Sequence, residues 1–213
     1  MNPALYRSLP LRAIRRLMLW LPSRSRLVIL RASRLDYQPE PLHGFSIVRL
    51  AGTLSAEQRE TVEKAMAAAA EPRGLVAQRL AHGDQFFGWQ IDDDVVSFGW
   101  VTYKDRIVGR IQFKDAVGRA FLFNFHTLAP YRGRGLYPAL LEMMRFTLGK
   151  EAITEYIIDV NAHNVSSLKG IHKAGFSPVV QIDYWQLLKH WLWIEKSSQL
   201  NNTATSHLFS VNF

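Results

Sequence analysis

The chain has 213 residues, of which 48% are hydrophobic and 21% are charged, as in one ordinary globular domain or one domain with an appendage. It contains no cysteine, which excludes disulfides, cysteine-based metal centres and a thiol nucleophile and fits a reducing compartment. Its net charge of +8 indicates an anionic partner, unless the excess charge is confined to one segment.

The excess charge is in fact confined to the N-terminus. Eight of the 26 basic residues, all of them arginines, lie within 1–34, where no acidic residue occurs. The rest of the chain holds 18 basic and 18 acidic residues and is formally neutral. We therefore predict a basic N-terminal arm and linker over 1–44, the linker being the proline-containing stretch 35–44. The apolar run 17–21 is too short for a signal peptide or a spanning helix, so the protein is predicted to be cytoplasmic.

Within the arm, 11–21 is predicted to form a short helix with apolar residues on one face and arginines on another. Such a helix can lie on an anionic membrane surface, which would bring the protein to the inner face of the membrane. The preferred alternative is that it packs on the domain with its arginines in solvent. Nucleic-acid binding by the arm is disfavoured, because the body is neutral and few aromatic residues or glycines interrupt the arginines.

After the linker, the sequence pattern predicts alternating strands and helices. A strand over 45–50 precedes two helices, one from a capping box at Ser55 to about 70 and one over 74–81. The later elements are strands over 86–91, 95–103, 106–113 and 120–127, a helix over 136–148, a strand over 153–160, a helix over 165–173 and strands over 179–188 and 191–194. The polar stretch 197–213 is predicted to be a flexible tail. This order predicts an α/β fold with a mixed sheet and helices on its faces.

The most informative segment is P-Y-R-G-R-G-L-Y-P-A-L-L, which follows an apolar strand and opens a helix. Glycines at Gly133 and Gly135 allow close approach of the backbone to a ligand, and the free amides of a helix N-terminus favour an anion. The pattern is not a P-loop, since no G-K-[ST] is present, and Pro138 breaks the dinucleotide fingerprint. The segment is therefore predicted to be another kind of phosphate-binding loop. The acidic run 92–94 reads as a turn, and no metal site is predicted.

The segment T-L-A-P-Y-R-G-R-G-L-Y-P-A-L-L resembles the acyl-CoA-binding motif of the GNAT superfamily of N-acetyltransferases, with matches at Arg132, Gly133, Arg134, Gly135 and Leu136. The downstream stretch N-A-H-N-V-S-S-L-K-G-I-H-K-A-G-F resembles the second signature of that family. Asn164, Gly175 and Phe176 carry this second match, and the resemblance covers about the last three-quarters of the chain. It implies a GNAT-like domain over 45–196, with a central, mostly antiparallel sheet that splays at the acyl-CoA site and helices on both faces.

The resemblance also implies roles for individual residues. The strand 121–127 would splay from its neighbour and offer backbone groups to pantetheine near His126 and Thr127. The amides from Gly133 to Tyr137 would hold the pyrophosphate of acetyl-CoA. Asn164 and Ser167 would face the pantetheine and nucleotide, although Asn164 is equally suited to cap its helix.

Two departures from the family pattern stand out. Tyr137 occupies a position where the family usually has Gly or Ala. Ile171 replaces the tyrosine that commonly protonates the departing thiolate. As base for the amine, His126 and Asp159 are the candidates, although a strand histidine is more often structural and Asp159 can be an ion-pair partner.

The sequence thus favours an N-acyltransferase that transfers an acyl group, expected to be acetyl, from acyl-CoA to a primary amine of a small acceptor. The amine would attack the thioester directly, without an enzyme nucleophile. The alternative is a non-catalytic acyl-CoA-binding module of the same fold, which the missing tyrosine favours.

Overall fold

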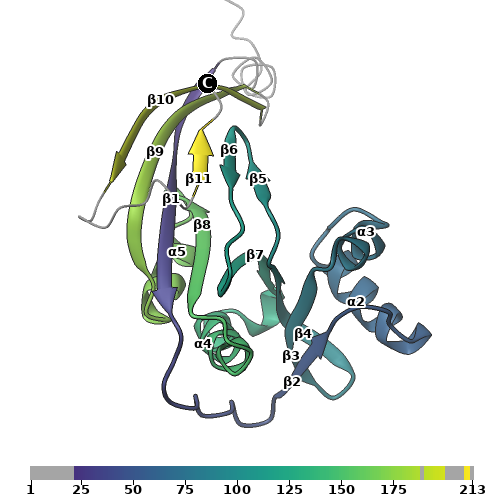
Figure 1. Ribbon diagram of the computed structural model, residues 1–213. Helices are drawn as coiled ribbons and strands as arrows, with labels where there is room; N and C mark the ends of the chain where they lie inside the picture. Colours follow the sequence, from purple (N-terminus) through teal and green to yellow (C-terminus); the bar gives the residue numbers. More distant parts are fainter. Residues whose placement is uncertain (1–21, 188–189, 200–208, 212–213) are drawn as a thin grey trace, which may run out of the picture.

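A computed structural model describes residues 22–187, 190–199 and 209–211. Its main feature is a sheet of eight strands in the order β10-β9-β1-β8-β7-β4-β3-β2 (Figure 1). In chain order these strands are β1 (Ser23–Ser33), β2 (Ser46–Leu50), β3 (Gln85–Ile91), β4 (Asp94–Thr102), β7 (Arg119–Thr127), β8 (Glu155–Asn161), β9 (Ser177–Leu187) and β10 (His190–Gln199).

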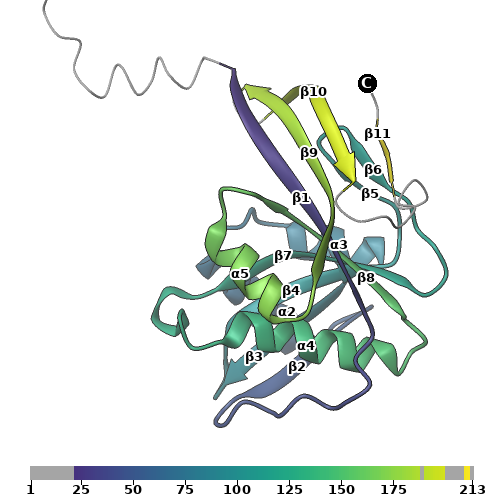
Figure 2. The ribbon, with the colours of Figure 1, turned by 90° about the vertical axis from the view of Figure 1, so that its left-hand side faces the viewer.

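Helices cover both faces of this sheet, as predicted. They are α2 (Ala56–Ala68), α3 (Leu75–His82), α4 (Leu136–Gly149) and α5 (Val165–Lys173). In Figure 2, α4 and α5 lie in front of the sheet and α2 and α3 lie behind it. The predicted capping box starts α2: the Ser55 hydroxyl accepts from the Gln58 amide and the Gln58 side chain accepts from the Ser55 amide. The predicted mixed α/β fold is therefore confirmed.

The sheet is antiparallel at every junction but one, and that junction comes apart. Strands β7 and β8 run parallel and pair only from Arg119 with Glu155 to Leu122 with Ile158. Beyond this point β7 continues along β4 and β8 continues along β1. The two strands thus separate in the middle of the sheet, which is the splay that the resemblance implies.

Three apolar clusters hold the layers together. One lies under α4 and α5 and includes Leu140 and Leu141. A second lies under α2 and α3 and includes Val62 and Trp100. The third fills the space between the β1-β8-β9 part of the sheet and a small second sheet. The first and third clusters each contain buried residues of both β7 and β8, so the paired part of these strands, directly before the split, is packed on both faces.

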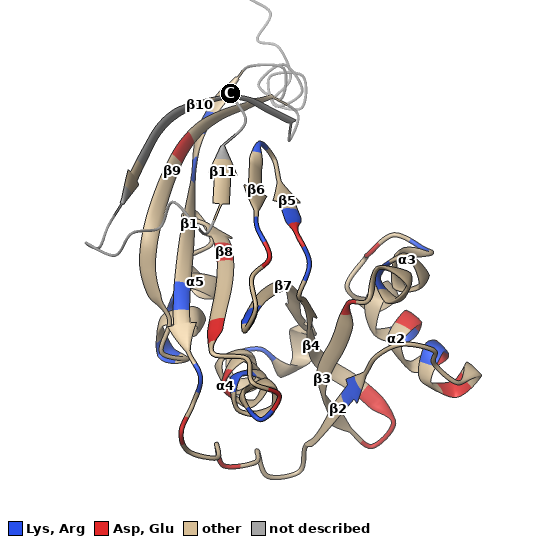
Figure 3. Ribbon diagram, viewed as in Figure 1, with Lys and Arg blue, Asp and Glu red and all other residues tan. Residues whose placement is uncertain are grey.

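Strand β1 corrects the assignment of residues 23–33 to the basic arm. It lies between β8 and β9 and pairs with both over most of its length. Its centre is the apolar run Leu27–Leu30, which is buried, whereas the side chains of its arginines are partly exposed (β1 carries blue segments in Figure 3). The strand can enter the sheet despite the charge of its arginines, because burial of the apolar run is favourable and acidic residues of β8 and β9 pair with the arginines. The helix predicted over 11–21, and with it the membrane contact, lies outside the described residues.

The second sheet corrects two further predictions. The segment 106–113 is not one strand but a hairpin of β5 (Arg106–Val108) and β6 (Ile111–Phe113). Gly109, with φ of +59°, opens the two-residue turn between them. The tail also contributes: β10 reaches Gln199, and β11 (Phe209–Val211) pairs with β6. Phe209 packs near Phe113, so an apolar contact anchors this part of the predicted tail.

A β-bulge shapes β7 next to the split. The pairing of β4 with β7 shifts between Phe98 and Trp100, so that Asn124 and Phe125 together face Gly99. Asn124 takes a φ of +52°, a left-handed conformation that asparagine tolerates better than most residues. The Phe125 ring lies over Gly99, where a Cβ atom would come within 2.1 Å of ring atom Cε1. The bulge thus depends on a residue without a side chain at position 99.

Gly99→Ala is therefore expected to lower the free energy of unfolding by about 2 kcal/mol, because the added methyl group forces the Phe125 ring to move. Urea unfolding measures this change. In a Phe125→Ala background the same substitution should cost almost nothing, since the clashing ring is gone. An equal cost in both backgrounds would show that the Phe125 ring does not restrict position 99.

Candidate functional site

The loop before α4 has the geometry of an anion site. Gly133 and Gly135 both have a φ of +77°, and a Cβ atom at either position would meet no atom within 4 Å. The loop is therefore held by backbone conformation rather than by crowding, and open space lies on the side where side chains would project. The first amides of α4 have no partner within the helix and carry its positive dipole end.

The start of α4 is fixed to the sheet by side chains. The buried Trp89 donates from Nε1 to the carbonyl oxygen of Leu136 at 3.1 Å. Arg132 donates from Nε to the carbonyl oxygen of Thr127 at 2.9 Å, which ties the loop back to the end of β7. The Thr127 hydroxyl in turn lies 2.8 Å from that of Ser97. Arg134 lies over the ring of Tyr131, in the 3₁₀ turn Ala129–Tyr131, at 5.2 Å from its centroid. Both arginines thus stand at the rim of the loop.

His126 lies beyond the split on the face of the sheet that α2 and α3 cover. Its Nε2 is 3.2 Å from Oε1 of Glu71, and its ring stacks on Phe98. The same Glu71 oxygen accepts from Nδ2 of Asn124 at 2.7 Å. A carboxylate therefore fixes the orientation of the imidazole, which is the arrangement of an oriented histidine base.

Glu71 was missed by the sequence analysis. It lies three residues after the end of α2, where Ala70 takes a φ of +59° and the Glu71 amide donates to the carbonyl oxygen of Met66. This left-handed helix end turns the chain towards β7. The only local signal is an acidic residue after a predicted helix, and nothing in the sequence connects it with a histidine 55 residues later.

Arg79 of α3 extends the same cluster. Its Nη1 donates to Oδ1 of Asn124 at 3.0 Å, and its guanidinium group lies over the rings of Trp100 and Phe123. Burial lowers the pKa of Arg79 from its usual value, with Glu71 acting in the opposite direction. Arg79 therefore connects α3 with the bulge and holds Asn124 in place beside Glu71.

Asp159 has a different charged partner from His126. It projects from β8 and forms an ion pair with Arg106 of the β5–β6 hairpin. Only 13% of its side chain is exposed, and the Arg106 guanidinium group lies over the Phe123 ring. One of the two roles considered for Asp159, that of an ion-pair partner, is thus present in the structure.

The start of α5 carries the second motif. The Asn164 side chain caps the helix, its Oδ1 accepting from the Ser167 amide at 3.1 Å. The Ser167 hydroxyl lies 3.2 Å from that of Tyr137 on α4. Two residues predicted from separate motifs, Tyr137 and Ser167, thus meet between the two helix N-termini.

The sequence profile of the acetyltransferase (GNAT) family matches residues 56–176 of this chain. The chain belongs to the GNAT family of acetyltransferases. The matched region runs from α2 to the end of α5 and so includes the loop before α4, the split and Glu71. Acyl transfer from acetyl-CoA is the general activity of this family. No curated protein matches the chain in sequence.

Solved structures with the same fold include several GNAT proteins. A GCN5-related N-acetyltransferase from Sphaerobacter thermophilus aligns with a TM-score of 0.56 and 15% identity over 83% of this chain and 56% of its own. A GNAT acetyltransferase from Colwellia psychrerythraea aligns with a TM-score of 0.53 and 16% identity over 78% of this chain and 57% of its own. A putative GNAT acetyltransferase from Novosphingobium aromaticivorans aligns with a TM-score of 0.50 and 20% identity over 76% of this chain and 63% of its own. The chain thus spans less than two thirds of each of these proteins, and the likeness concerns the fold.

Both departures from the GNAT pattern have a visible structural basis. Ile171 is fully buried in the cluster beneath α4 and α5, so this position contributes to the core. Tyr137 is largely buried, and burial raises the pKa of its hydroxyl to about 12. The phenol therefore stays neutral at physiological pH and acts as a hydrogen-bond partner of Ser167.

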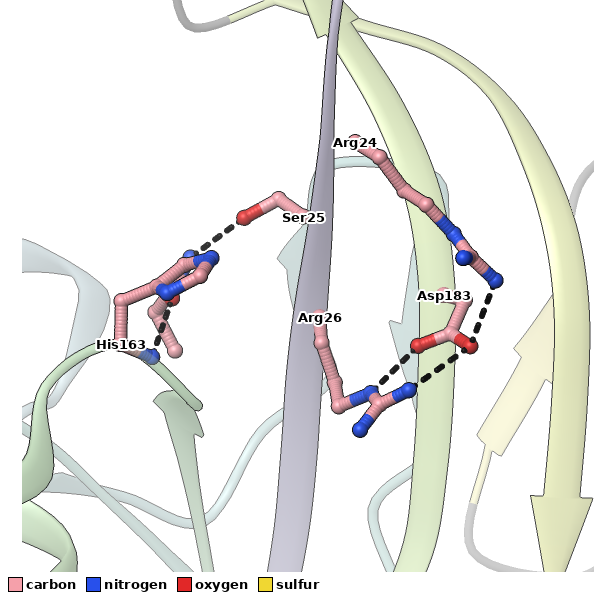
Figure 4. A network of polar contacts seen from close by, with 6 residues as sticks. Arg24, Ser25, Arg26, His163 and Asp183 are labelled. Atoms are coloured by element: carbon pink, nitrogen blue, oxygen red, sulfur yellow. Dashed lines mark hydrogen bonds and ion pairs between the residues drawn. The ribbon is translucent and has the colours of Figure 1, made fainter.

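A separate pocket of about 200 Å³ lies on the other side of β8, between β1, β9 and the loop before α5 (Figure 4). Asp183 accepts from Arg24 and from Nε of Arg26 at 2.6 Å, while Asn161 bonds both Ser25 and the amide of His163. None of the predicted site residues lines this pocket, although Ala162 and His163 of the second motif do. These contacts join the arginine-rich start of β1 to the GNAT domain.

Across the described residues, no three histidine, aspartate or glutamate side chains are grouped so that they could hold a metal ion. The helices found in the same part of the chain include none with the length and apolar character needed to cross a membrane.

Proposed function

We propose that this GNAT protein is an N-acyltransferase that transfers the acetyl group of acetyl-CoA to a primary amine of a small acceptor. The observation that carries the proposal is the arrangement around the split. An anion-binding helix N-terminus lies on one face of the sheet, a carboxylate-oriented histidine lies on the other, and the two parallel strands separate between them.

The residues before α4 fit a pyrophosphate. The positive φ angles of Gly133 and Gly135 leave the space beside the loop open, and Arg132 and Arg134 add positive charge at its rim. In this proposal the amides from Gly133 to Tyr137 bind the phosphates. Backbone groups of β7 near His126 and Thr127, together with Asn164 and Ser167 of α5, line the path of the pantetheine arm.

His126 serves as the base. Because Glu71 faces Nε2, the neutral imidazole carries its proton there and leaves Nδ1 free to accept a proton. Acetyl-CoA supplies the thioester, at whose carbonyl carbon the amine nitrogen forms the new bond while the carbon–sulfur bond breaks. The amine proton passes to Nδ1 of His126. A thiolate is a stable leaving group, so the scheme requires no protein acid at Ile171.

Release of free thiol from acetyl-CoA in the presence of a panel of small amines tests this proposal. Thiol release that depends on both protein and amine, with formation of the acetylated amine, is the expected result. Hydrolysis without an acetylated product would contradict it.

A non-catalytic acyl-CoA-binding module is the second candidate, because an isoleucine stands where the family commonly has its acid. It predicts binding of acetyl-CoA without thiol release for any amine in the panel. The cytoplasmic compartment and a contact of the arm with the inner membrane face stay predictions of the sequence in either case.

A further inference from the structure

The ring of Tyr137 lies across the space between the start of α4 and the start of α5. It contacts the Phe125 ring of β7, with centroids 5.2 Å apart. Its hydroxyl meets that of Ser167, in the first turn of α5, at 3.2 Å. The Tyr137 side chain of α4 thus contacts both β7 and α5.

Helix α5 has a matching surface for this ring. Gly170 lies in the middle of the helix, and a Cβ atom there would come within 2.6 Å of Cδ1 of Tyr137. Glycine in a helix interior is less stable than alanine by up to about 1 kcal/mol. The helix therefore contains an unfavourable residue at a position where a methyl group would displace the ring.

The position of this ring matters because Phe125 and His126, at the end of the bulge, face opposite sides of the sheet. Phe125 contacts Tyr137 on the side of α4 and α5, whereas His126 contacts Glu71 on the side of α2 and α3. A donor with its pyrophosphate at the start of α4 and its thioester at His126 must pass from the first side to the second. That passage is the split between β7 and β8, and the Tyr137 ring contacts Phe125, a β7 residue beyond the last β7–β8 pair.

We propose that Tyr137 controls admission of the acyl donor, its ring blocking the approach to the split while it rests on Gly170. This inference rests on the proposed function. Turning the ring outward opens the approach, while the Tyr137 amide remains available to a phosphate. The affinity for the donor is then reduced by the fraction of molecules in which the ring is turned in. Tyr137 is therefore a residue that sets donor affinity, and it takes no part in the chemical step.

Two substitutions test this proposal by different routes, with binding measured by calorimetry. Tyr137→Ala removes the ring. Gly170→Ala leaves the tyrosine intact and displaces it with a methyl group. Both are expected to bind acetyl-CoA about tenfold more tightly than the unmodified protein. Tyr137→Phe, which loses only the bond to Ser167, should give a smaller gain.

Binding of ADP distinguishes an effect on the approach to the split from an effect on the phosphate loop, because ADP carries a pyrophosphate but no pantetheine arm. Its affinity should be the same in all of these proteins. Val165→Ala controls for helix stability, since this exposed residue also lies on α5, and it should leave both affinities unchanged.

Different results would contradict this inference and the proposed function. Weaker or unchanged binding of acetyl-CoA by Tyr137→Ala would overturn the proposal, because the ring would then support the donor or lie outside its path. Equal gains for ADP and acetyl-CoA would also overturn it, by assigning the effect to the phosphate loop. Absence of acetyl-CoA binding in every protein, the unmodified one included, would reject the proposed function itself.

Discussion

His126→Gln is expected to lower kcat for acetyl transfer at least about a hundredfold, the contribution typical of a positioned base. Glutamine retains a donor for Glu71, so the change removes the proton acceptor while preserving a contact at Oε1. The pH profile of kcat/KM gives the decisive readout. The rise in rate that reflects deprotonation of the base should be present in the unmodified enzyme and absent from the variant.

Two matched variants assign the role. Glu71→Gln should reduce kcat by a smaller factor, because the imidazole remains but its orientation and proton position are no longer fixed. Asp159→Asn should leave the pH profile unchanged, because its ion pair with Arg106 lies outside the reaction in this account. If Asp159→Asn removed the pH dependence and His126→Gln retained full activity, the assignment of the base would be wrong.

Arg145→Met is expected to lower the free energy of unfolding by about 3 kcal/mol. Arg145 of α4 is 5% exposed and donates from Nε to the carbonyl oxygen of Ser33 at 2.8 Å and from Nη1 to that of Ala174 at 2.5 Å. Burial lowers the pKa of this guanidinium group. Methionine fills similar space but leaves the carbonyl oxygens without these donors.

This prediction concerns the site as well as stability, because Arg145 joins α4 to the ends of β1 and α5. Arg134→Met is the matched control: the same change at an exposed position of the loop should leave unfolding almost unaffected. Urea unfolding of both variants measures the difference. Equal stability of the two variants would show that the Arg145 hydrogen bonds contribute nothing net to the fold.

Local sequence patterns were sufficient to predict the parts of the site that lie at the starts of helices. The Ser55 capping box, the Asn164 cap and the glycines before α4 all depend on neighbours within a few residues. Their predicted positions agree with the structure for this reason. The splay between β7 and β8 followed only from the resemblance to the GNAT family, since no local pattern separates two strands.

Contacts between distant segments could not be predicted in this way. The arginines of β1 suggested an exposed arm, because their partners Asp183 and Glu155 lie more than a hundred residues away. Glu71 approaches His126 only when α2 packs on the sheet. The ring of Tyr137 fits Gly170 only once α4 and α5 are in contact. In each case the local sequence carries the residue but not its partner.

The central claim, that the loop before α4 binds the phosphates of acetyl-CoA, is tested most directly by a calorimetric titration of three proteins. These are the unmodified protein, Gly133→Val and Gly44→Val. Both glycines have a φ near +78° and no neighbour within 4 Å of a Cβ position, so the two substitutions impose the same backbone strain. Only Gly133 lies in the proposed phosphate loop.

The account predicts saturable binding of one acetyl-CoA per chain by the unmodified protein and by Gly44→Val. It predicts binding at least about tenfold weaker in Gly133→Val, because valine turns the loop amides away from the phosphates. Equal affinity of Gly133→Val and Gly44→Val, or no binding by the unmodified protein, would contradict the claim.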